Sequence, residues 1–148
     1  MRSLALWIVI GLGAAACSAE RRALKKEEKA IEALSHAAAS YWQAIRWNYW
    51  DTAAGYYEDT EERMNWLTEQ GTAPTYRYTS ATLMRVEVEP PVEDPAPGEV
   101  MRRGRVFVQV QGYPLATQVV EQKVLNQPWV SKDEDAKIWF IETDEAAD

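Results

Sequence analysis

The hydrophobic period of this chain changes once, near Pro74, and that change constrains the fold more than any other feature. From Lys25 to Trp47 apolar residues recur at steps of three and four, which is the spacing of one helix face. Two shorter helices are expected, from the N-cap candidate Asp51 to Tyr57 and from Thr60 to Gln70, with Gly71 as a typical C-cap. Beyond Pro74 the segments are short, rich in β-branched and aromatic residues, and alternate between apolar and polar, which is typical of half-buried strands.

The second half of the chain therefore predicts a sheet. Strands are expected at 76–79 with 81–88, 105–111, 115–130 and 137–143, with a turn at 112–114. Four of the seven prolines fall within 90–98 and indicate an exposed connector, because proline donates no ladder hydrogen bond. The charged run 132–135 is expected at a hairpin tip. Helices followed by strands that are joined through turns predict an α+β domain, with the N-terminal helices packed on a four-stranded antiparallel sheet.

The first residues have the layout of a processing signal. An uncharged apolar stretch from Leu4 to Ala16 is shorter than the roughly 20 residues of a membrane-spanning helix and suits a signal peptide. The run Leu12–Cys17, which ends on the only cysteine, resembles the bacterial lipobox, with Ala14 where leucine is usual. The resemblance implies cleavage before Cys17 and attachment of lipid such as palmitate to it. The alternative is ordinary secretory cleavage, which would leave a free thiol.

These observations predict both the division of the chain and its location. The expected parts are a lipoprotein signal peptide (1–16), a lipidated N-terminus with a charged tether (17–29), one α+β domain (30–143) and an acidic tail (144–148). Several acyl chains on one residue would anchor stably, since each buried CH₂ contributes about 0.8 kcal/mol. Ser18 in place of aspartate favours, by resemblance to enterobacterial sorting rules, the outer membrane with the domain facing the periplasm. The basic residues within 21–29 suit either anionic headgroups or a solvated helix start.

Charge and motifs exclude several classes of function. The net charge of −7 argues against nucleic acid as a partner, because phosphate binding needs a basic face. The sequence has no glycine-rich phosphate loop, HExxH, Cys/His metal set or GxSxG, so we assign no catalytic, metal or cofactor residue. The remaining acid–base candidates are the single histidine, His36, and Asp51 and Asp59, which flank the pair Tyr56-Tyr57. Capping and solvation also account for both aspartates.

The order of elements and the placement of aromatic residues resemble the nuclear transport factor 2-like superfamily, which includes ketosteroid isomerases and SnoaL-like proteins. The resemblance covers about 40–143 and is carried by the segments 41–45, 50–57, 118–130 and 135–141. It implies a curved, cone-shaped sheet with a cavity between sheet and helices. Catalytic members place an acid or a histidine base in that cavity, often beside a tyrosine.

Aromatic residues are densest between 41 and 57, and they exceed what one helix face buries. Part of this set is expected in the core, and the rest predicts an apolar binding surface. The candidate ligand- or partner-binding residues are Tyr41, Trp42, Trp47, Trp50, Tyr56 and Tyr57. We expect a lipid-anchored cell-envelope protein that binds a protein partner or an apolar ligand through an aromatic pocket or surface. Two alternatives stay open: a cavity-based isomerase or lyase, and a structural homodimer paired through the open sheet face.

Overall fold

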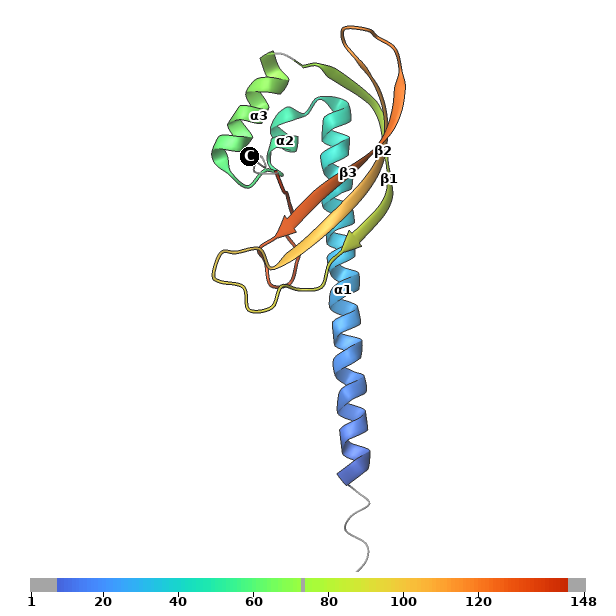
Figure 1. The fold of residues 1–148 in the computed structure, drawn as a ribbon, viewed down its shortest axis with the longest axis vertical. Coiled ribbons are helices and arrows are strands. Elements are labelled where there is room, and N and C mark those ends of the chain that lie inside the picture. The colour runs from blue at the N-terminus through green and yellow to red at the C-terminus, as the bar shows by residue number, and fades with distance from the viewer. Residues whose placement is uncertain (1–7, 73, 144–148) are drawn as a thin grey trace, which may run out of the picture.

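The computed structural model describes residues 8–72 and 74–143, and it describes side chains from Ser18 onwards. Its longest element is α1 (Ile8–Trp47), a helix of 40 residues that extends well beyond the rest of the fold (Figure 1). At 1.5 Å per residue, α1 is about 60 Å long. The helix expected from Lys25 therefore starts earlier, and the tether expected at 17–29 is helical and, from residue 18 on, exposed. Residues 1–7 of the expected leader and the acidic tail 144–148 lie outside the described residues.

The C-terminal end of α1 lies where the sequence predicts it. Asn48 has a φ of 58°, the left-handed conformation that ends many helices. Its N–H donates to the carbonyl of Ile45, and the N–H of Tyr49 donates to the carbonyl of Ala44. These two bonds form a Schellman motif, which satisfies the last carbonyls of α1 and turns the chain sharply.

Of the two short helices, the second begins at the predicted residue Thr60, whereas the first begins one residue before the predicted Asp51. α2 (Trp50–Ala54) includes Asp51 in its first turn, so Asp51 is not the N-cap. α3 (Thr60–Thr72) is capped by Asp59, whose Oδ1 accepts the backbone N–H groups of Glu61 at 2.8 Å and Glu62 at 3.0 Å. Gly71 lies within the last turn of α3 and is not a C-cap.

The predicted α+β class and the four-stranded antiparallel sheet are confirmed. The strands are β1 (Tyr76–Val88), β2 (Arg102–Pro114), β3 (Glu121–Ser131) and β4 (Phe140–Ile141), paired in the order β1-β2-β3-β4. The turn expected at 112–114 is wrong, because these residues pair with β1 and the chain turns only beyond Pro114. Consequently β3 begins later than expected, and the last strand is only two residues long.

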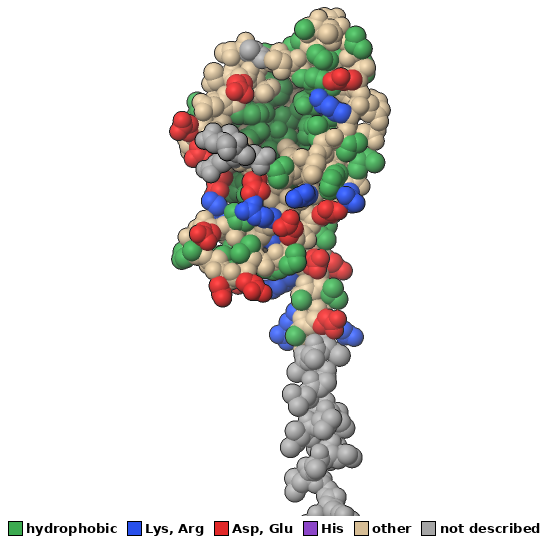
Figure 2. Space-filling view, viewed as in Figure 1, with side chains coloured by type: hydrophobic (Ala, Val, Ile, Leu, Met, Phe, Trp, Pro, Cys, Tyr) green, Lys and Arg blue, Asp and Glu red, His purple; other side chains and the backbone are tan. Residues whose placement is uncertain are grey.

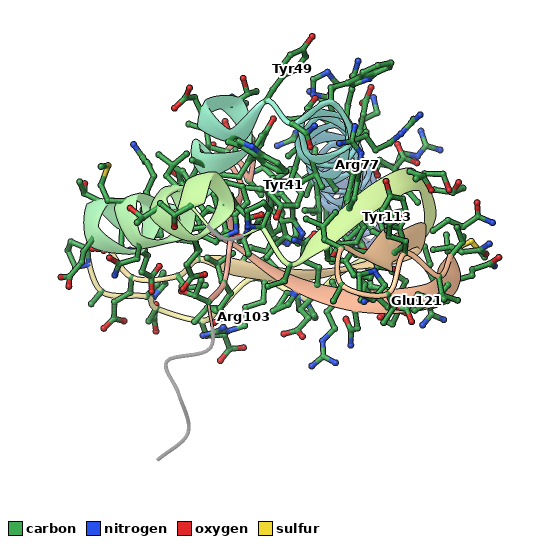
Figure 3. All side chains as sticks on the ribbon, turned by 90° about the horizontal axis from the view of Figure 1, so that it is seen from above. Tyr41, Tyr49, Arg77, Arg103, Tyr113 and Glu121 are labelled. Carbon is green, nitrogen blue, oxygen red and sulfur yellow. The ribbon has the colours of Figure 1, made fainter. Side chains whose placement is uncertain are left out.

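The helices lie on one side of the sheet, and the core lies between them (Figure 3). Along β2, Val106, Val108 and Val110 are fully buried on the helix side, while the residues between them face outwards. Gly104 on the same face permits close approach of α1, since a Cβ there would lie 2.5 Å from Leu34 Cδ2. Alternation along β2 therefore places one apolar stripe directly under α1.

Candidate functional site

A cleft of about 100 Å³ lies between the helices and β1, and we call it the aromatic cleft. Its rings are Tyr41, Trp42, Trp50, Trp66, Tyr76 and Tyr78. In Figure 2, hydrophobic side chains gather in a hollow of the domain at the end opposite the start of α1. The position follows from the fold, because three helices and one strand converge there (Figure 1).

Each element brings its rings to the aromatic cleft through its own periodicity. β1 supplies Tyr76 and Tyr78, which lie two residues apart and therefore share one face of the sheet. α3 supplies Trp66 and Gln70, which lie four residues apart and therefore share one face of the helix. The C-terminal part of α1 supplies the buried rings at the bottom, among them Tyr41, which lies between helices and sheet in Figure 3.

The rings support one another by edge-to-face contacts. The centroids of Trp42 and Tyr78 are 5.3 Å apart at 79°, and those of Trp50 and Trp66 are 6.1 Å apart at 72°. Tyr76 and Tyr78 lie closer, at 4.7 Å. Such pairs contribute about 0.5–1.5 kcal/mol each beyond the area they bury. The walls of the aromatic cleft are therefore preformed.

The polar atoms beneath the aromatic cleft are paired with one another. Gln127 Oε1 on β3 accepts hydrogen bonds from the indole Nε1 atoms of both Trp42 and Trp129, each at 3.2 Å. The hydroxyl oxygens of Tyr41 and Tyr57 are 3.5 Å apart. The cleft thus has a polar network below and ring surface above.

The tyrosines around the aromatic cleft are held in their neutral form. Burial, and then the neighbouring Tyr57, raises the pKa of Tyr41 well above its usual 10.0. Burial also raises the pKa of Tyr57 and Tyr78, and burial followed by the Glu121 carboxylate raises the pKa of Tyr76. At neutral pH these hydroxyls are therefore hydrogen-bond donors and not bases.

The structure separates the six residues that the sequence nominates. Tyr41, Trp42 and Trp50 line the aromatic cleft. Tyr56 and Tyr57 pack beside it in the interior, with Tyr56 5.8 Å from the Trp129 ring and Tyr57 5.3 Å from the Trp66 ring. Trp47 is 60% exposed and does not line the aromatic cleft.

Sequence reasoning missed the other wall of the cleft. Tyr76 and Tyr78 carry a usable signal, since their two-residue spacing already predicts one strand face. Trp66 lies on the apolar side of the third helix, which the sequence also indicates. What the sequence lacks is the packing that brings these rings against Trp42 and Trp50.

The acid–base candidates do not reach the aromatic cleft. His36, Asp51 and Asp59 are all exposed, and Asp59 is engaged as the N-cap of α3. The isomerase or lyase alternative requires one of them to point into a pocket beside a tyrosine, and none of the three lines the aromatic cleft. Among the described residues, no group of three histidines, cysteines or acids is placed to hold a metal ion. The side chain of Cys17 lies outside the described ones.

A second, larger hollow of about 680 Å³ lies at the opposite end of the domain, and we call it the basal hollow. It is enclosed by α1 at Ala23, Lys26 and Glu27, by the proline-rich connector 90–95 and by the turn 133–135. Five acidic and two basic residues line it. From the sequence these three segments are predicted to be a tether, a connector and a hairpin tip. Nothing in the sequence indicates that they lie next to one another in the fold.

The chain matches no protein-family model, no curated protein and no solved structure. In the part of the chain that the structure describes, no helix is both long and apolar enough to cross a membrane. The geometry of the two hollows and the sequence pattern around Cys17 are therefore the features that bear on function.

Proposed function

We propose that this chain is a lipid-anchored cell-envelope protein that binds a protein partner by accepting one apolar side chain in the aromatic cleft. The volume of the cleft carries the proposal. Small-molecule sites occupy about 300–1,000 Å³, whereas the aromatic cleft measures about 100 Å³. A hollow of that size suits a single anchor residue, and anchors of this kind dominate the energy of many interfaces.

The margin of the aromatic cleft suggests what flanks the anchor. The Lys123 ammonium lies 4.2 Å from the centroid of the Tyr76 ring, on an exposed side chain. The same ammonium lies 3.8 Å from Glu121 Oε1. An acidic residue next to the anchor would take the place of Glu121 as its partner. The preferred partner segment is therefore a large apolar residue beside a carboxylate.

The proposal includes attachment through Cys17 at the outer membrane, with the domain facing the periplasm. The lipobox pattern supports the attachment, and Ser18 in place of aspartate supports the outer membrane. Ala30, where burial begins, lies thirteen positions after Cys17 along α1. At 1.5 Å per residue, the domain would be held about 20 Å from the lipid.

We also propose that the domain belongs to the nuclear transport factor 2-like superfamily, with the aromatic cleft as its interlayer cavity. The order of elements, three helices before four antiparallel strands, supports the assignment. An experimentally determined structure in which the sheet does not curve around the cleft would reject it.

The partner proposal is tested by photo-crosslinking in intact cells. A photoreactive residue replaces Trp66 at the wall of the aromatic cleft or, as the control, exposed Gln43 on α1. We expect a discrete crosslinked species from position 66 only, and its loss when Tyr78→Ala is added. Identical species from both positions, or persistence in the Tyr78→Ala background, would reject the aromatic cleft as the contact.

The anchor is tested separately by labelling with radioactive palmitate. Label in the unaltered chain and its absence in Cys17→Ala is the expected result. Label retained in Cys17→Ala would reject lipidation at this residue.

The basal hollow supports a second candidate function, the binding of a cationic amphiphile. Its volume of about 680 Å³ falls within the small-molecule range, and five of the seven charged residues that line it are acidic. Calorimetric titration below the micelle concentration should detect dodecyltrimethylammonium and not dodecyl sulfate. Asp133→Asn combined with Glu134→Gln should weaken that binding, and equal heats for the two amphiphiles would rule out charge recognition.

A further inference from the structure

One side of β3 is unpaired over most of its length. β4 pairs only with Trp129 and Val130. Within the described residues, β3 from Glu121 to Gln127 therefore has β2 on one side and no strand on the other. We call residues 119–127 the open edge; it belongs to the β2–β3 hairpin, which projects beyond the helices in Figure 1. Its backbone N–H and C=O groups are available to another strand.

The open edge has no register shift, and its two charged residues, Glu121 and Lys123, are opposite in sign. Natural edge strands are interrupted by bulges or proline, or carry charged side chains that repel a second strand. β1, the other edge of the sheet, has two register shifts, whereas the pairing of β3 with β2 is regular throughout. Val119 and Val120, which directly precede β3, and Val124 within it are 65%, 64% and 61% exposed. An edge this regular, whose charges a second strand can pair, is suited to strand addition.

The sequence of the open edge is complementary to itself when two copies run antiparallel. With Gln122 on the two-fold axis, Glu121 lies opposite Lys123 of the second copy, and Lys123 lies opposite its Glu121. Val120 and Val124 are matched in the same reciprocal way. Opposite charges and apolar pairs placed directly across two strands both stabilise the pairing.

Neighbouring registers lose this match. A shift of the axis onto Lys123 sets two ammonium groups opposite each other, and a shift onto Glu121 does the same with two carboxylates. An axis between two residues would place helix-side residues opposite outward ones, which the two-residue period of a strand forbids. Among these registers, only the axis on Gln122 pairs unlike charges and also pairs the valines.

We propose that a second copy of this chain occupies the open edge, so that two β3 strands pair antiparallel about Gln122 and the two sheets become continuous. The contact differs from a homodimer formed through the sheet face, because the outer face of β2 stays free. Lys123 also lies at the margin of the aromatic cleft, but the rings of the cleft take no part in the pairing of the two β3 strands, so either proposal can fail alone.

The test uses disulfide formation in the full chain carrying Cys17→Ala. Gln122→Cys places each new thiol opposite its symmetry mate, and residues facing each other across antiparallel strands are about 4.5–5.5 Å apart between Cα atoms, within disulfide reach. Gln111→Cys is the matched control, because Gln111 is the exposed β2 residue paired with Gln122, one strand further from the axis. Two such residues would be about 14 Å apart, well beyond disulfide reach.

We expect the Gln122→Cys chain to form a covalent dimer at least tenfold faster than the Gln111→Cys chain. In the Gln122→Cys background, Glu121→Lys alone and Lys123→Glu alone should slow that reaction, and the combined charge swap should restore it. Circular dichroism confirms that each variant is folded. Equal rates at positions 122 and 111, or failure of the combined swap to restore the rate, would overturn the proposal.

Discussion

Replacing Gln127 with leucine tests the polar network beneath the aromatic cleft. Gln127 Oε1 is the shared acceptor for two indole N–H groups, those of Trp42 and Trp129. Trp129 is fully buried and Trp42 is 5% exposed, so neither donor reaches water if the acceptor is lost. Gln127→Leu keeps a side chain of comparable volume and removes the amide, including the shared acceptor.

The magnitude follows from the number of donors left unpaired. A buried donor without an acceptor costs about 1–3 kcal/mol, and two are stranded here. Both bonds are 3.2 Å long, at the long end of the usual range for N–H···O. We therefore expect Gln127→Leu to lower the free energy of unfolding by about 3 kcal/mol, near the lower half of the combined range.

Urea unfolding followed by tryptophan fluorescence measures this loss, provided that the slope of the unfolding free energy against urea concentration is unchanged. Gln43→Leu on the exposed side of α1 is the matched control and should stay within about 0.5 kcal/mol of the unaltered chain. In a Trp42→Phe background one donor is already absent, so Gln127→Leu should cost about half as much. A loss below about 1 kcal/mol, or the same loss in both backgrounds, would refute the shared-acceptor argument.

Three further predictions concern the scaffold. Asp59→Ala removes the N-cap of α3 and should cost about 1 kcal/mol in thermal unfolding; an unchanged midpoint would contradict the capping role. Gly104→Ala forces a Cβ within 2.5 Å of Leu34 Cδ2 and should lower the free energy of unfolding in urea by about 1–3 kcal/mol. Gly71→Ala in α3 meets nothing within 4 Å and should raise it by up to about 1 kcal/mol. If Gly104→Ala were the more stable of the two variants, α1 would tolerate displacement. Because the pKa of Tyr41 is raised, the folded state holds the hydroxyl proton more tightly than the unfolded state does. The contribution of this proton to stability is therefore complete below pH 10 and is lost as the pH rises beyond. Urea midpoints between pH 8 and 11 should fall more steeply for the unaltered chain than for Tyr41→Phe.

The helix and strand classes could be predicted because each depends on a local period. The end of α1 at Trp47 depends on Asn48, a residue that tolerates a positive φ, so it is visible in the sequence. The start of α3 at Thr60 could be predicted because Asp59 and Thr60 both belong to the residue types that commonly begin a helix, and Asp59 provides the cap. The turn before β3 was misplaced because 112–114 has turn residues, yet Gly112 packs tightly against the backbone of Arg77 in β1.

The aromatic cleft could be predicted only on the side where its residues are neighbours in sequence. The aromatic-rich stretch 41–57 makes Trp47 a candidate together with Trp42. Five residues along a helix turn by about 500°, however, which places the two rings about 140° apart. That error could have been avoided from helix phase alone. Tyr76 and Tyr78 could not have been assigned to the same hollow, because their contact with Trp42 depends on how β1 crosses α1.

In the exposed part of α1, from 18 to 29, the number of residues sets both the distance of the domain from Cys17 and the direction in which the domain faces. A helix advances 1.5 Å and turns about 100° per residue. Removing seven residues from this segment would bring the domain about 10 Å closer to Cys17 and leave it facing almost the same way. Removing two would shift it by only about 3 Å yet swing the aromatic cleft through about 160°. An unstructured linker of equal length would transmit neither quantity, so here the phase of one helix decides in which direction the aromatic cleft opens.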